Sequence, residues 1–392
     1  MAKKDPAAAL LQQARRLARR HTNDRVDAWK EQGKPVIGYF CPYVPSEIIL
    51  ATGALPLRFR GSGSDDSSLG DAYMSSRLCT YVRHVVSLAL DDQFDFLDGQ
   101  ISLNTCDHVR RATDTLQAKT SIGFHGFLSV PRSPREDLFP YFLNELKKLF
   151  VGLSQYLGVE AGNDELRQAI RTMNDVRRRL VHIDSLRMKD RPKLSGADAL
   201  AIHVAARSLP PEEFVQYADE LIKALEAREG LAALRGRLVV IGPELDSPAY
   251  LDAIESQGAI IVADRLCFGS RALPHHIDAD APDPLEAIAR ATFFRTPCAR
   301  MIGDFPTRWD ALVQTVSDAR ADGVVFPRLM FCDPWGADVY NMGHRIKKDA
   351  LFPVLFLTRE YGIVASGQVK TRVQAFLERI EIAKARAKKG ES

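Results

Sequence analysis

The sequence predicts an α/β protein of two parallel-sheet domains, Rossmann-like or flavodoxin-like, with a helical leader and a helical insert. Three observations carry this prediction. Apolar strand-like runs alternate with helical segments over residues 34–135, the alternation restarts over 236–392, and the stretch between them has a helical period without strands. Strands that alternate with helices favour βαβ units and parallel sheets. We therefore expect a leader over 1–33, an N-terminal domain over 34–135, an insert over 136–235 and a C-terminal domain over 236–392.

The first domain opens with a strand–helix–strand unit. A strand is expected at 36–39 and a second at 55–59. The helix between them, at 47–52, can be capped by Ser46 and is ended by Gly53. The further elements expected here are a loop at 61–70, a helix at 74–90, a strand within 94–103 and a helix over 106–116.

Helical periodicity with long charged faces predicts the insert, and a second strand–helix alternation follows it. The interval from Gly38 to Gly53 is one residue shorter than that from Gly242 to Gly258, which favours a duplicated module. The insert helices are expected at 136–156, 164–188, 196–206 and 211–228. The second domain is expected to have strands at 238–242, 259–262, 323–326 and 351–357, and helices at 247–257, 309–320 and 371–387.

Composition excludes several classes of protein. The chain has 392 residues, 46% hydrophobic and 26% charged, which is enough apolar material for two soluble cores. A formal net charge of +3 gives no case for nucleic-acid binding, and no apolar run is long enough to predict a membrane span. The amphipathic N-terminus lacks the apolar core and cleavage site of a signal peptide, so a docking helix or a transit segment both remain open. We expect a cytoplasmic, reducing location.

Six cysteines are the main candidates for chemistry, three before the insert and three after it. Several follow a strand or begin a helix, where open α/β sheets bind ligands and helix N-termini favour thiolates. A reducing compartment disfavours disulfides, and zinc would prefer the close Cys-x-x-Cys pairs that are absent here. One cysteine per loop suits a larger inorganic cluster, whereas core packing is the ordinary alternative. The six are Cys41, Cys79, Cys106, Cys267, Cys298 and Cys332.

Several motifs resemble the 2-hydroxyacyl-CoA dehydratase and benzoyl-CoA reductase superfamily. The resemblance covers nearly the whole chain from Lys34 to about Glu381, and the motifs are specific when taken together. The segments that carry it are GYFCPYVPSE at 38–47, ATGALP at 51–56, NTCDHVRR at 104–111, FCDPWGAD at 331–338 and GQVKTR at 367–372.

The resemblance implies two α/β domains per subunit with an iron–sulfur cluster between them. Dehydratase subunits hold one 4Fe-4S cubane through three cysteines, and the matching positions here are Cys79, Cys106 and Cys332. Double-cubane relatives hold an 8Fe-9S cluster through six, and Cys41, Cys267 and Cys298 complete that number. The last two stand in DRLCFGSR at 264–271 and TPCAR at 296–300. Length and the runs GDAY and RLCT look most like the smaller cluster-binding subunit of ATP-dependent benzoyl-CoA reductase.

The resemblance also implies partners. The chain has no Gly-x-x-x-x-Gly-Lys-Ser/Thr phosphate loop, so we expect it not to hydrolyse ATP itself. Relatives receive electrons from a separate ATPase module that carries its own 4Fe-4S cluster and is fed by ferredoxin. They work as paired homologous subunits, so we expect a sister subunit, which could also bind the aromatic acyl-CoA. An apolar stripe on the leader could contact that partner, or the leader could fold back on the helical insert.

Four other residues are candidates near the cluster, each with a plainer alternative. Glu47 could be catalytic, or could be a carboxylate that favours its helix dipole. His108 could relay protons or hydrogen-bond a cluster sulfide, or could lie on the surface. Arg271 and Arg300 follow their cysteines closely and could moderate cluster charge, or could form salt bridges elsewhere. His275 and His276 are more readily explained as part of a solvated loop than as a metal site.

Four functions remain open from the sequence. The leading interpretation is an iron–sulfur subunit of an oxidoreductase that passes single low-potential electrons to an aromatic acyl-CoA ring. A second is an (R)-2-hydroxyacyl-CoA dehydratase subunit with one 4Fe-4S cluster. A third is a homodimeric double-cubane reductase of small molecules. A fourth is a catalytically silent electron-transfer or scaffold subunit.

Overall fold

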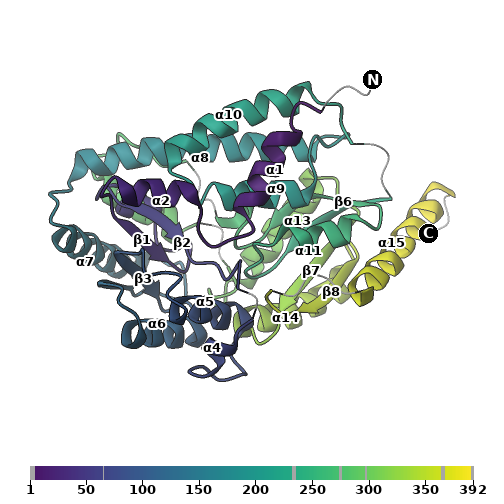
Figure 1. The fold of residues 1–392 in the computed structure, drawn as a ribbon. Helices are drawn as coiled ribbons and strands as arrows, with labels where there is room; N and C mark the ends of the chain where they lie inside the picture. The colour runs from purple at the N-terminus through teal and green to yellow at the C-terminus, as the bar shows by residue number, and fades with distance from the viewer. Residues whose placement is uncertain are drawn as a thin grey trace.

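The structure is a computed structural model that describes residues 5–64, 66–231, 235–272, 276–295, 298–362 and 367–389. It places two four-stranded sheets beside each other, with helices around and between them (Figure 1). Every strand pair is parallel. The predicted fold class of two parallel-sheet α/β domains is therefore confirmed.

The first sheet has the strand order β2-β1-β3-β4. The first three strands are buried along their whole length, as expected where helices cover both faces of a parallel sheet. The strands are β1 (Val36–Tyr39), β2 (Leu55–Arg58), β3 (Gly99–Leu103) and β4 (Phe124–Leu128). Their helices are α3 (Ser46–Leu50), α4 (Ser68–Asp71), α5 (Thr80–Leu90) and α6 (Asp107–Lys119).

The second sheet repeats that order as β6-β5-β7-β8. In both sheets the chain therefore reverses its direction of winding between the first and third strands, which is the point where such sheets bind ligands. The strands are β5 (Gly236–Ile241), β6 (Ala259–Arg265), β7 (Gly323–Leu329) and β8 (Val354–Arg359). The helices are α11 (Pro248–Glu255), α12 (Pro284–Phe293), α13 (Phe305–Asp318), α14 (Asp333–Asp349) and α15 (Gly367–Lys389).

Four helices separate the sheets in the sequence, and three of them pack directly on the sheets or their helices. Helix α7 lies on β4 and shares a core with the first sheet, α8 contacts both α3 and β6, and α9 contacts β6. In return, α12 from the second half packs on α7 and α8. The four are α7 (Phe139–Leu157), α8 (Asn163–Met188), α9 (Gly196–Ala205) and α10 (Pro211–Ala227), of which α10 lies on α8. The domain boundaries at 33, 135 and 235 remain predictions.

The leader folds back on its own chain. Helix α1 (Ala8–Leu17) lies across α9, and its apolar stripe is buried there (Figure 1). Its C-terminal carbonyls accept hydrogen bonds from the buried Arg60, at 3.2 Å from Leu17 O and 3.2 Å from Ala18 O. Helix α2 (Asp24–Glu31) follows. The stripe on α1 is therefore occupied within the subunit, so it gives no support to a partner-binding role for the leader.

Several expected elements differ from the structure. The helix predicted over 74–90 begins only at Thr80, because Cys79 has extended backbone angles and acts as the N-terminal cap residue. Strand β4 and helices α12 and α14 were not expected, since β4 is half-exposed and α14 begins with an Asp-Pro pair that is typical of a turn. Within the described ranges, none of the helices combines the length and apolar character that crossing a membrane requires.

Candidate functional site

All six cysteines line one cavity between the two sheets. The cavity encloses about 660 Å³ of space free of protein atoms, part of it open to solvent. Cys41, Cys79 and Cys267 are buried, and the other three are partly exposed. None of the six forms a disulfide. Thiols from distant parts of the sequence therefore meet at a single place.

The strand ends explain how these thiols converge. Four cysteines follow the carboxyl ends of β1, β3, β6 and β7, and the other two lie in the crossovers from the second to the third strand of each sheet. Carboxyl ends of parallel strands share one edge, so loops distant in sequence become neighbours. Cys79, Cys106 and Cys332 are the N-terminal cap residues of α5, α6 and α14. Helix N-termini carry partial positive charge, which favours thiolates.

The thiols form two groups that cut across the two halves of the chain. Burial raises the pKa of Cys41 to about 11, with further contributions from the neighbouring thiols Cys267 and Cys298. These three thiols are called the Cys267 group below. Burial likewise raises the pKa of Cys332, to which Glu244, Cys79 and Cys106 also contribute.

The thiols of Cys79, Cys106 and Cys332 are called the Cys79 group below. Each group thus contains thiols from both halves of the chain. The grouping in space therefore differs from the grouping in the sequence, where three cysteines precede the insert and three follow it. Cys41 also contributes to the raised pKa of Cys106, after burial and Glu244, so the two groups adjoin. Six thiols around one continuous cavity could bind a single ligand that lies between them.

Four buried arginines surround the Cys267 group without any carboxylate partner within the described residues. Their exposed fractions are 1% for Arg58, 8% for Arg271, 4% for Arg295 and 2% for Arg300. An isolated charge in a protein interior costs several kcal/mol, so buried arginines are normally paired. A cavity lined by unpaired guanidiniums and by thiols fits an anionic occupant. Iron–sulfur clusters held by thiolates are of this kind.

The guanidiniums are held in place by main-chain carbonyls. Arg58 donates to Cys267 O at 2.5 Å and to Cys267 Sγ at 2.9 Å. Arg271 donates to Gly242 O and Arg265 O, both at 3.1 Å, and its guanidinium lies 4.8 Å from the Trp335 ring. These bonds fix Arg271 at the cavity wall and Arg58 behind Cys267, and neither guanidinium has a carboxylate partner among the described residues.

Arg300 is anchored in the same way and leaves one donor free. It donates to Val130 O at 2.9 Å and Pro131 O at 3.1 Å. Its Nε, the Tyr43 hydroxyl and the Thr105 hydroxyl are buried polar atoms of cavity-lining residues that have no hydrogen-bond partner in the part of the chain that the structure describes. Buried polar atoms are nearly always satisfied, so unpartnered ones at a single cavity indicate that a polar occupant belongs there.

His108 lies beside the Cys79 group. Its Nδ1 accepts a hydrogen bond from the Cys79 N–H at 3.2 Å, and its Nε2 lies 3.3 Å from Asp333 Oδ2. Because Nδ1 accepts from the Cys79 N–H, this arrangement assigns the ring proton to Nε2, on the side of Asp333. His108 therefore connects the loops of Cys79 and Cys106 with the start of α14, where Cys332 is the cap residue. The surface alternative for His108 is wrong, since the side chain is buried.

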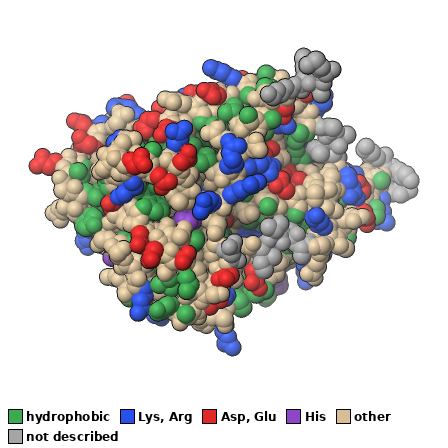
Figure 2. Space-filling view, in the orientation of Figure 1, with side chains coloured by type: hydrophobic (Ala, Val, Ile, Leu, Met, Phe, Trp, Pro, Cys, Tyr) green, Lys and Arg blue, Asp and Glu red, His purple; other side chains and the backbone are tan. Residues whose placement is uncertain are grey.

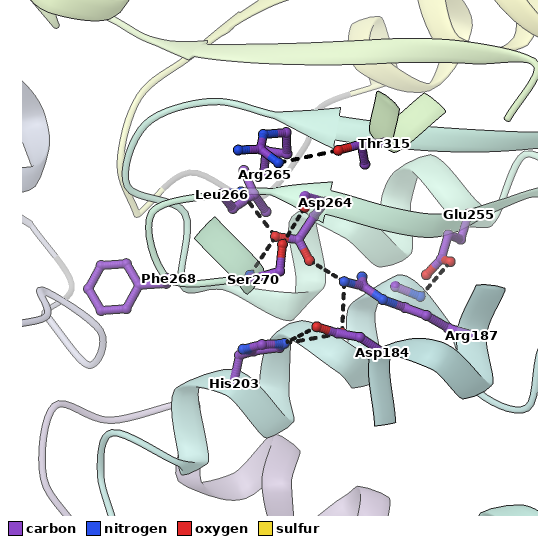
Figure 3. Close-up of polar contacts among 12 residues, drawn as sticks. Asp184, Arg187, His203, Glu255, Asp264, Arg265, Leu266, Phe268, Ser270 and Thr315 are labelled. Carbon is purple, nitrogen blue, oxygen red and sulfur yellow. Dashed lines mark hydrogen bonds and ion pairs between the residues drawn. The ribbon is translucent and has the colours of Figure 1, made fainter. Parts of the chain in front are cut away.

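The loop that carries Cys267 is built around one buried carboxylate (Figure 3). Asp264 Oδ1 accepts the N–H groups of Leu266 and Ser270, both at 3.0 Å, and Oδ2 accepts Arg187 Nη2 at 2.5 Å. Burial opposes ionisation of Asp264, but the Arg187 charge outweighs it and holds the pKa of this carboxyl below its usual range. The same guanidinium nitrogen contacts Asp184 at 2.9 Å. Helix α8 thereby fixes the position of the Cys267 loop.

Glu47 does not line the cysteine cavity. It is buried at the start of α3 and forms an ion pair with Arg177 of α8. Arg177 also donates to Asn174 Oδ1 at 2.7 Å. The structure therefore gives Glu47 a contact that joins the first domain to α8, and its catalytic role remains a prediction. His275 lies outside the described residues, and His276 is exposed.

A mononuclear metal site is not formed by these thiols as they are placed. Among the residues that the structure describes, no group of three or more His, Cys, Asp or Glu side chains is arranged to hold a single metal ion. Donors to one zinc must converge to bonds of about 2.3 Å on a common point. Thiols arranged around the wall of a cavity instead suit an occupant that has several metal atoms.

The residues predicted from sequence make up part of this site. The six cysteines, His108, Arg271 and Arg300 all line the cavity. The prediction did not include Tyr43, Arg295 and Glu244, which also line it, or Arg58, which bonds Cys267. A usable signal existed for two of these: Arg58 ends β2 and Glu244 follows β5, and polar residues at strand ends are candidates for a ligand site.

Comparison with known proteins finds similarity to subunits of enzymes that are named for CoA thioesters. The C subunit of benzoyl-CoA reductase from Thauera aromatica is 29% identical over 314 residues, covering 78% of this chain and 81% of its own length. The beta subunit of (R)-2-hydroxyglutaryl-CoA dehydratase of Acidaminococcus fermentans is 25% identical, covering 89% and 93%. The (R)-phenyllactyl-CoA dehydratase beta subunit of Clostridium sporogenes is 23% identical, covering 89% and 92%.

The fold and the inter-domain thiol cavity thus define a two-domain α/β protein related to dehydratase and reductase subunits. The family described as "2-hydroxyglutaryl-CoA dehydratase, D-component" matches residues 41–380. The chain belongs to this family, within the superfamily that its motifs resemble. All three relatives are named as subunits of enzymes, which supports an enzyme subunit here and a partner subunit beside it.

Proposed function

We propose that the cavity holds an iron–sulfur cluster ligated by Cys41, Cys79, Cys106, Cys267, Cys298 and Cys332. The observation that carries the proposal is the meeting of all six thiols at one cavity, in two adjoining groups of three. Two groups of three suit an 8Fe-9S double cubane, in which each half takes three thiolates and the halves share a bridging sulfide. When bound, such a cluster supplies one-electron chemistry at low potential.

The chain would then be the iron–sulfur subunit of an ATP-dependent reductase of an aromatic acyl-CoA, of the benzoyl-CoA reductase type. The similarity to the benzoyl-CoA reductase subunit of Thauera aromatica supports this substrate class. The electrons would come from ferredoxin through a separate ATPase module with its own 4Fe-4S cluster, in the cytoplasm. A homologous sister subunit would complete the enzyme and could bind the acyl-CoA.

The chain's own residues would hold and shield the cluster. His108 would keep the Cys79, Cys106 and Cys332 loops in register, since it bonds the first and contacts Asp333 beside the last. Arg271 and Arg300 would face the cluster with positive charge, and the free Nε of Arg300 could donate to it. Glu47 would act on the site only through the α3–α8 contact.

A second candidate is a subunit of an (R)-2-hydroxyacyl-CoA dehydratase with a single 4Fe-4S cluster. The dehydratase relatives and the family description favour it. In that case only Cys79, Cys106 and Cys332 would bind iron. A homodimeric double-cubane reductase of small molecules is a third candidate that the six thiols also fit.

Iron and acid-labile sulfide counts on the anaerobically purified chain test the proposal. We expect about eight irons per chain, since two cubane halves each contribute four. Cys41→Ser, Cys267→Ser and Cys298→Ser should each lower the iron content, because a serine alkoxide is a poorer ligand for iron than a thiolate. About four irons, with these three variants unchanged, would establish the dehydratase-type cluster instead.

Two further measurements test the proposed partners. Light scattering after size-exclusion chromatography should show a larger assembly when the chain is co-expressed with a homologous sister subunit. Calorimetry should show no ATP binding by the pure chain, since it lacks a phosphate-binding glycine loop. A cluster-loaded monomer that reduces substrate with only a chemical reductant would argue against the partner proposal.

A further inference from the structure

The two thiol groups lie in different electrostatic surroundings. Arg58 donates a hydrogen bond to the Cys267 sulfur at 2.9 Å. Burial raises the pKa of Cys267 and Glu244 adds to this, whereas Arg58 and Arg271 act to lower it. Arg295 and Arg300 approach the same group through the Tyr43 ring, at 5.4 and 5.3 Å from its centroid. Positive charge is therefore concentrated at one end of the cavity.

Further arginines behind this end show how crowded the positive charge is. Burial lowers the pKa of Arg265 to about 10, and the nearby Arg271 contributes to that shift. Burial lowers the pKa of Arg207 to about 10 as well, with a contribution from Arg58. A guanidinium loses its proton more readily only where its charge is poorly solvated and poorly compensated.

In the part of the chain that the structure describes, the Cys79 group faces the acidic Glu244 without a guanidinium bonded to its sulfurs. Glu244 lines the cavity and contributes to the raised pKa of all three thiols of this group, in each case after burial, and it contributes to that of Cys267 as well. Asp333 lies beside this group through His108. No guanidinium is bonded to any of these three sulfurs among the described residues. Guanidiniums therefore offset the charge of Glu244 at the Cys267 end of the cavity, whereas the Cys79 end has no such bonded cation within the described ranges.

Charges of this kind act strongly because the wall is buried. In an interior, the interaction between unit charges a few ångströms apart is several times larger than in water. Positive charge beside a cluster stabilises its reduced form and raises its reduction potential, whereas negative charge lowers it. An added electron would therefore be more stable beside the Cys267 group than beside the Cys79 group.

We propose that the Cys267 group forms the electron-accepting end of the cavity, and that Arg58 is the residue that sets this polarity. The inference rests on the proposed six-cysteine cluster and goes beyond it by assigning different roles to the two ends. Arg58 is a positioning residue in this assignment: it acts through its charge on the ligand Cys267. The electron itself comes from a one-electron donor of low potential.

A purely structural role for Arg58 predicts a different result. Its bond to the Cys267 carbonyl could simply hold the loop, and then the loss of cluster binding would be the main effect of its removal. Charge and shape can be separated, because lysine keeps the charge without the planar fork, whereas methionine keeps the bulk without the charge. Arg60 offers a matched control, since it is a buried arginine two positions away that bonds α1 and does not line the cavity.

The test is a redox titration followed by EPR on the anaerobically purified chain, with titanium(III) citrate as the reductant, which is oxidised to titanium(IV) as it donates one electron. Iron is counted first in every sample. We expect Arg58→Met to retain iron and to weaken the higher-potential reduction step at least tenfold in equilibrium constant, about 59 mV for one electron. Arg58→Lys should recover most of that shift, and Arg60→Met should titrate as the wild type does.

Glu244→Gln provides an independent arm that does not depend on the Cys267 loop. Removing this negative charge should raise the lower-potential step more than the higher one, because Glu244 acts on all three thiols of the Cys79 group and, in the Cys267 group, on Cys267. An iron-loaded Arg58→Met with unchanged potentials, or equal shifts in Arg58→Met and Arg58→Lys, overturns the proposal. If Arg58→Met loses iron, an unchanged potential in Glu244→Gln overturns it. A wild-type chain without a six-cysteine cluster would instead refute the proposed function, and the iron count shows which has failed.

Discussion

The two halves of the molecule share a topology but place different residues at equivalent positions. Both sheets have the strand order second-first-third-fourth. Cys106 and Cys332 follow the third strands, and Cys79 and Cys298 lie in equivalent crossovers. The remaining positions differ. After the first strand, one half has Cys41 and the other Glu244; at the second strand, one half has Arg58 and the other Cys267.

This comparison shows how a repeated fold can make an asymmetric site. The backbone repeat supplies loops at matching strand ends, and it brings both sets to one cavity. The residue types at those loops then decide the charge at each end. The difference in charge between the two ends therefore arises from different side chains on a shared arrangement of strands. On the face of the molecule shown in Figure 2, basic and acidic side chains both occur.

The largest effect is expected from removing the equivalent thiols Cys106 and Cys332. Each variant, Cys106→Ser and Cys332→Ser, should lose about half of the iron or more, because each removes a ligand from the same group. Iron analysis of anaerobically purified protein measures this. If one variant keeps all its iron while the other loses it, the two third-strand positions are not equivalent.

Breaking the ion pair behind the Cys267 loop should have the second largest effect, a decrease in the free energy of unfolding. Arg187→Met leaves Asp264 buried without its cation, which typically costs about 3–5 kcal/mol. Urea unfolding measures the free energy. Arg178→Met on the exposed side of the same helix is the matched control and should change stability by less than about 0.5 kcal/mol. Equal losses of stability in Arg187→Met and Arg178→Met would show that the buried ion pair stabilises the fold no more than the exposed one.

The same carboxylate predicts a dependence of stability on acid. The pKa of Asp264 is lower in the folded chain than in the unfolded chain, so its contribution is complete above pH about 4 and is lost as the pH falls below that value. Asp264→Asn should therefore be least destabilised, relative to the wild type, at the lowest pH. Denaturant titrations at several pH values measure this difference. A constant difference across the range would exclude the linkage.

A methyl group at Gly269 tests how tightly that loop encloses its carboxylate. An added Cβ would lie 2.0 Å from Asp264 Oδ1, so Gly269→Ala must displace the loop and should cost about 1–3 kcal/mol. Gly343→Ala in α14 meets nothing within 4 Å and should instead stabilise by roughly 0.5–1 kcal/mol. Thermal unfolding compares the two. A neutral Gly269→Ala would mean that the loop adapts freely.

The smallest expected effect concerns the residue before Cys332. Phe331 has a φ of 63°, a strained value for an aromatic residue, whereas Thr105, before the equivalent Cys106, has no such angle. Because Phe331 is 43% exposed, little packing is lost on truncation. Phe331→Gly should be more stable than Phe331→Ala by about 1 kcal/mol, since only glycine adopts this angle freely. Equal stabilities in thermal unfolding would contradict strain at this position.

The sequence by itself determined the local elements and the identity of the thiols. Alternating strands and helices predicted both sheets, and β1 appears at Val36–Tyr39 as expected, because four consecutive apolar or small residues before a turn specify a buried strand. Motif resemblance identified the family and six candidate ligands. The start of α5 at Thr80 was missed, because the apolar pattern continues through a turn whose end Cys79 caps.

Only the tertiary structure decided which thiols are neighbours and which charges face them. Cys41 lies near Cys267 and Cys298 because the carboxyl ends of β1 and β6 face the same cavity. Helix α8 contacts both α3 and β6 and so holds the two sheets together, and no local sequence pattern predicts these contacts. Arg58 likewise meets Cys267 across 209 positions of sequence. Local propensity depends on residues a few positions apart, whereas the charge at each end of the cavity depends on how two sheets distant in the sequence pack together.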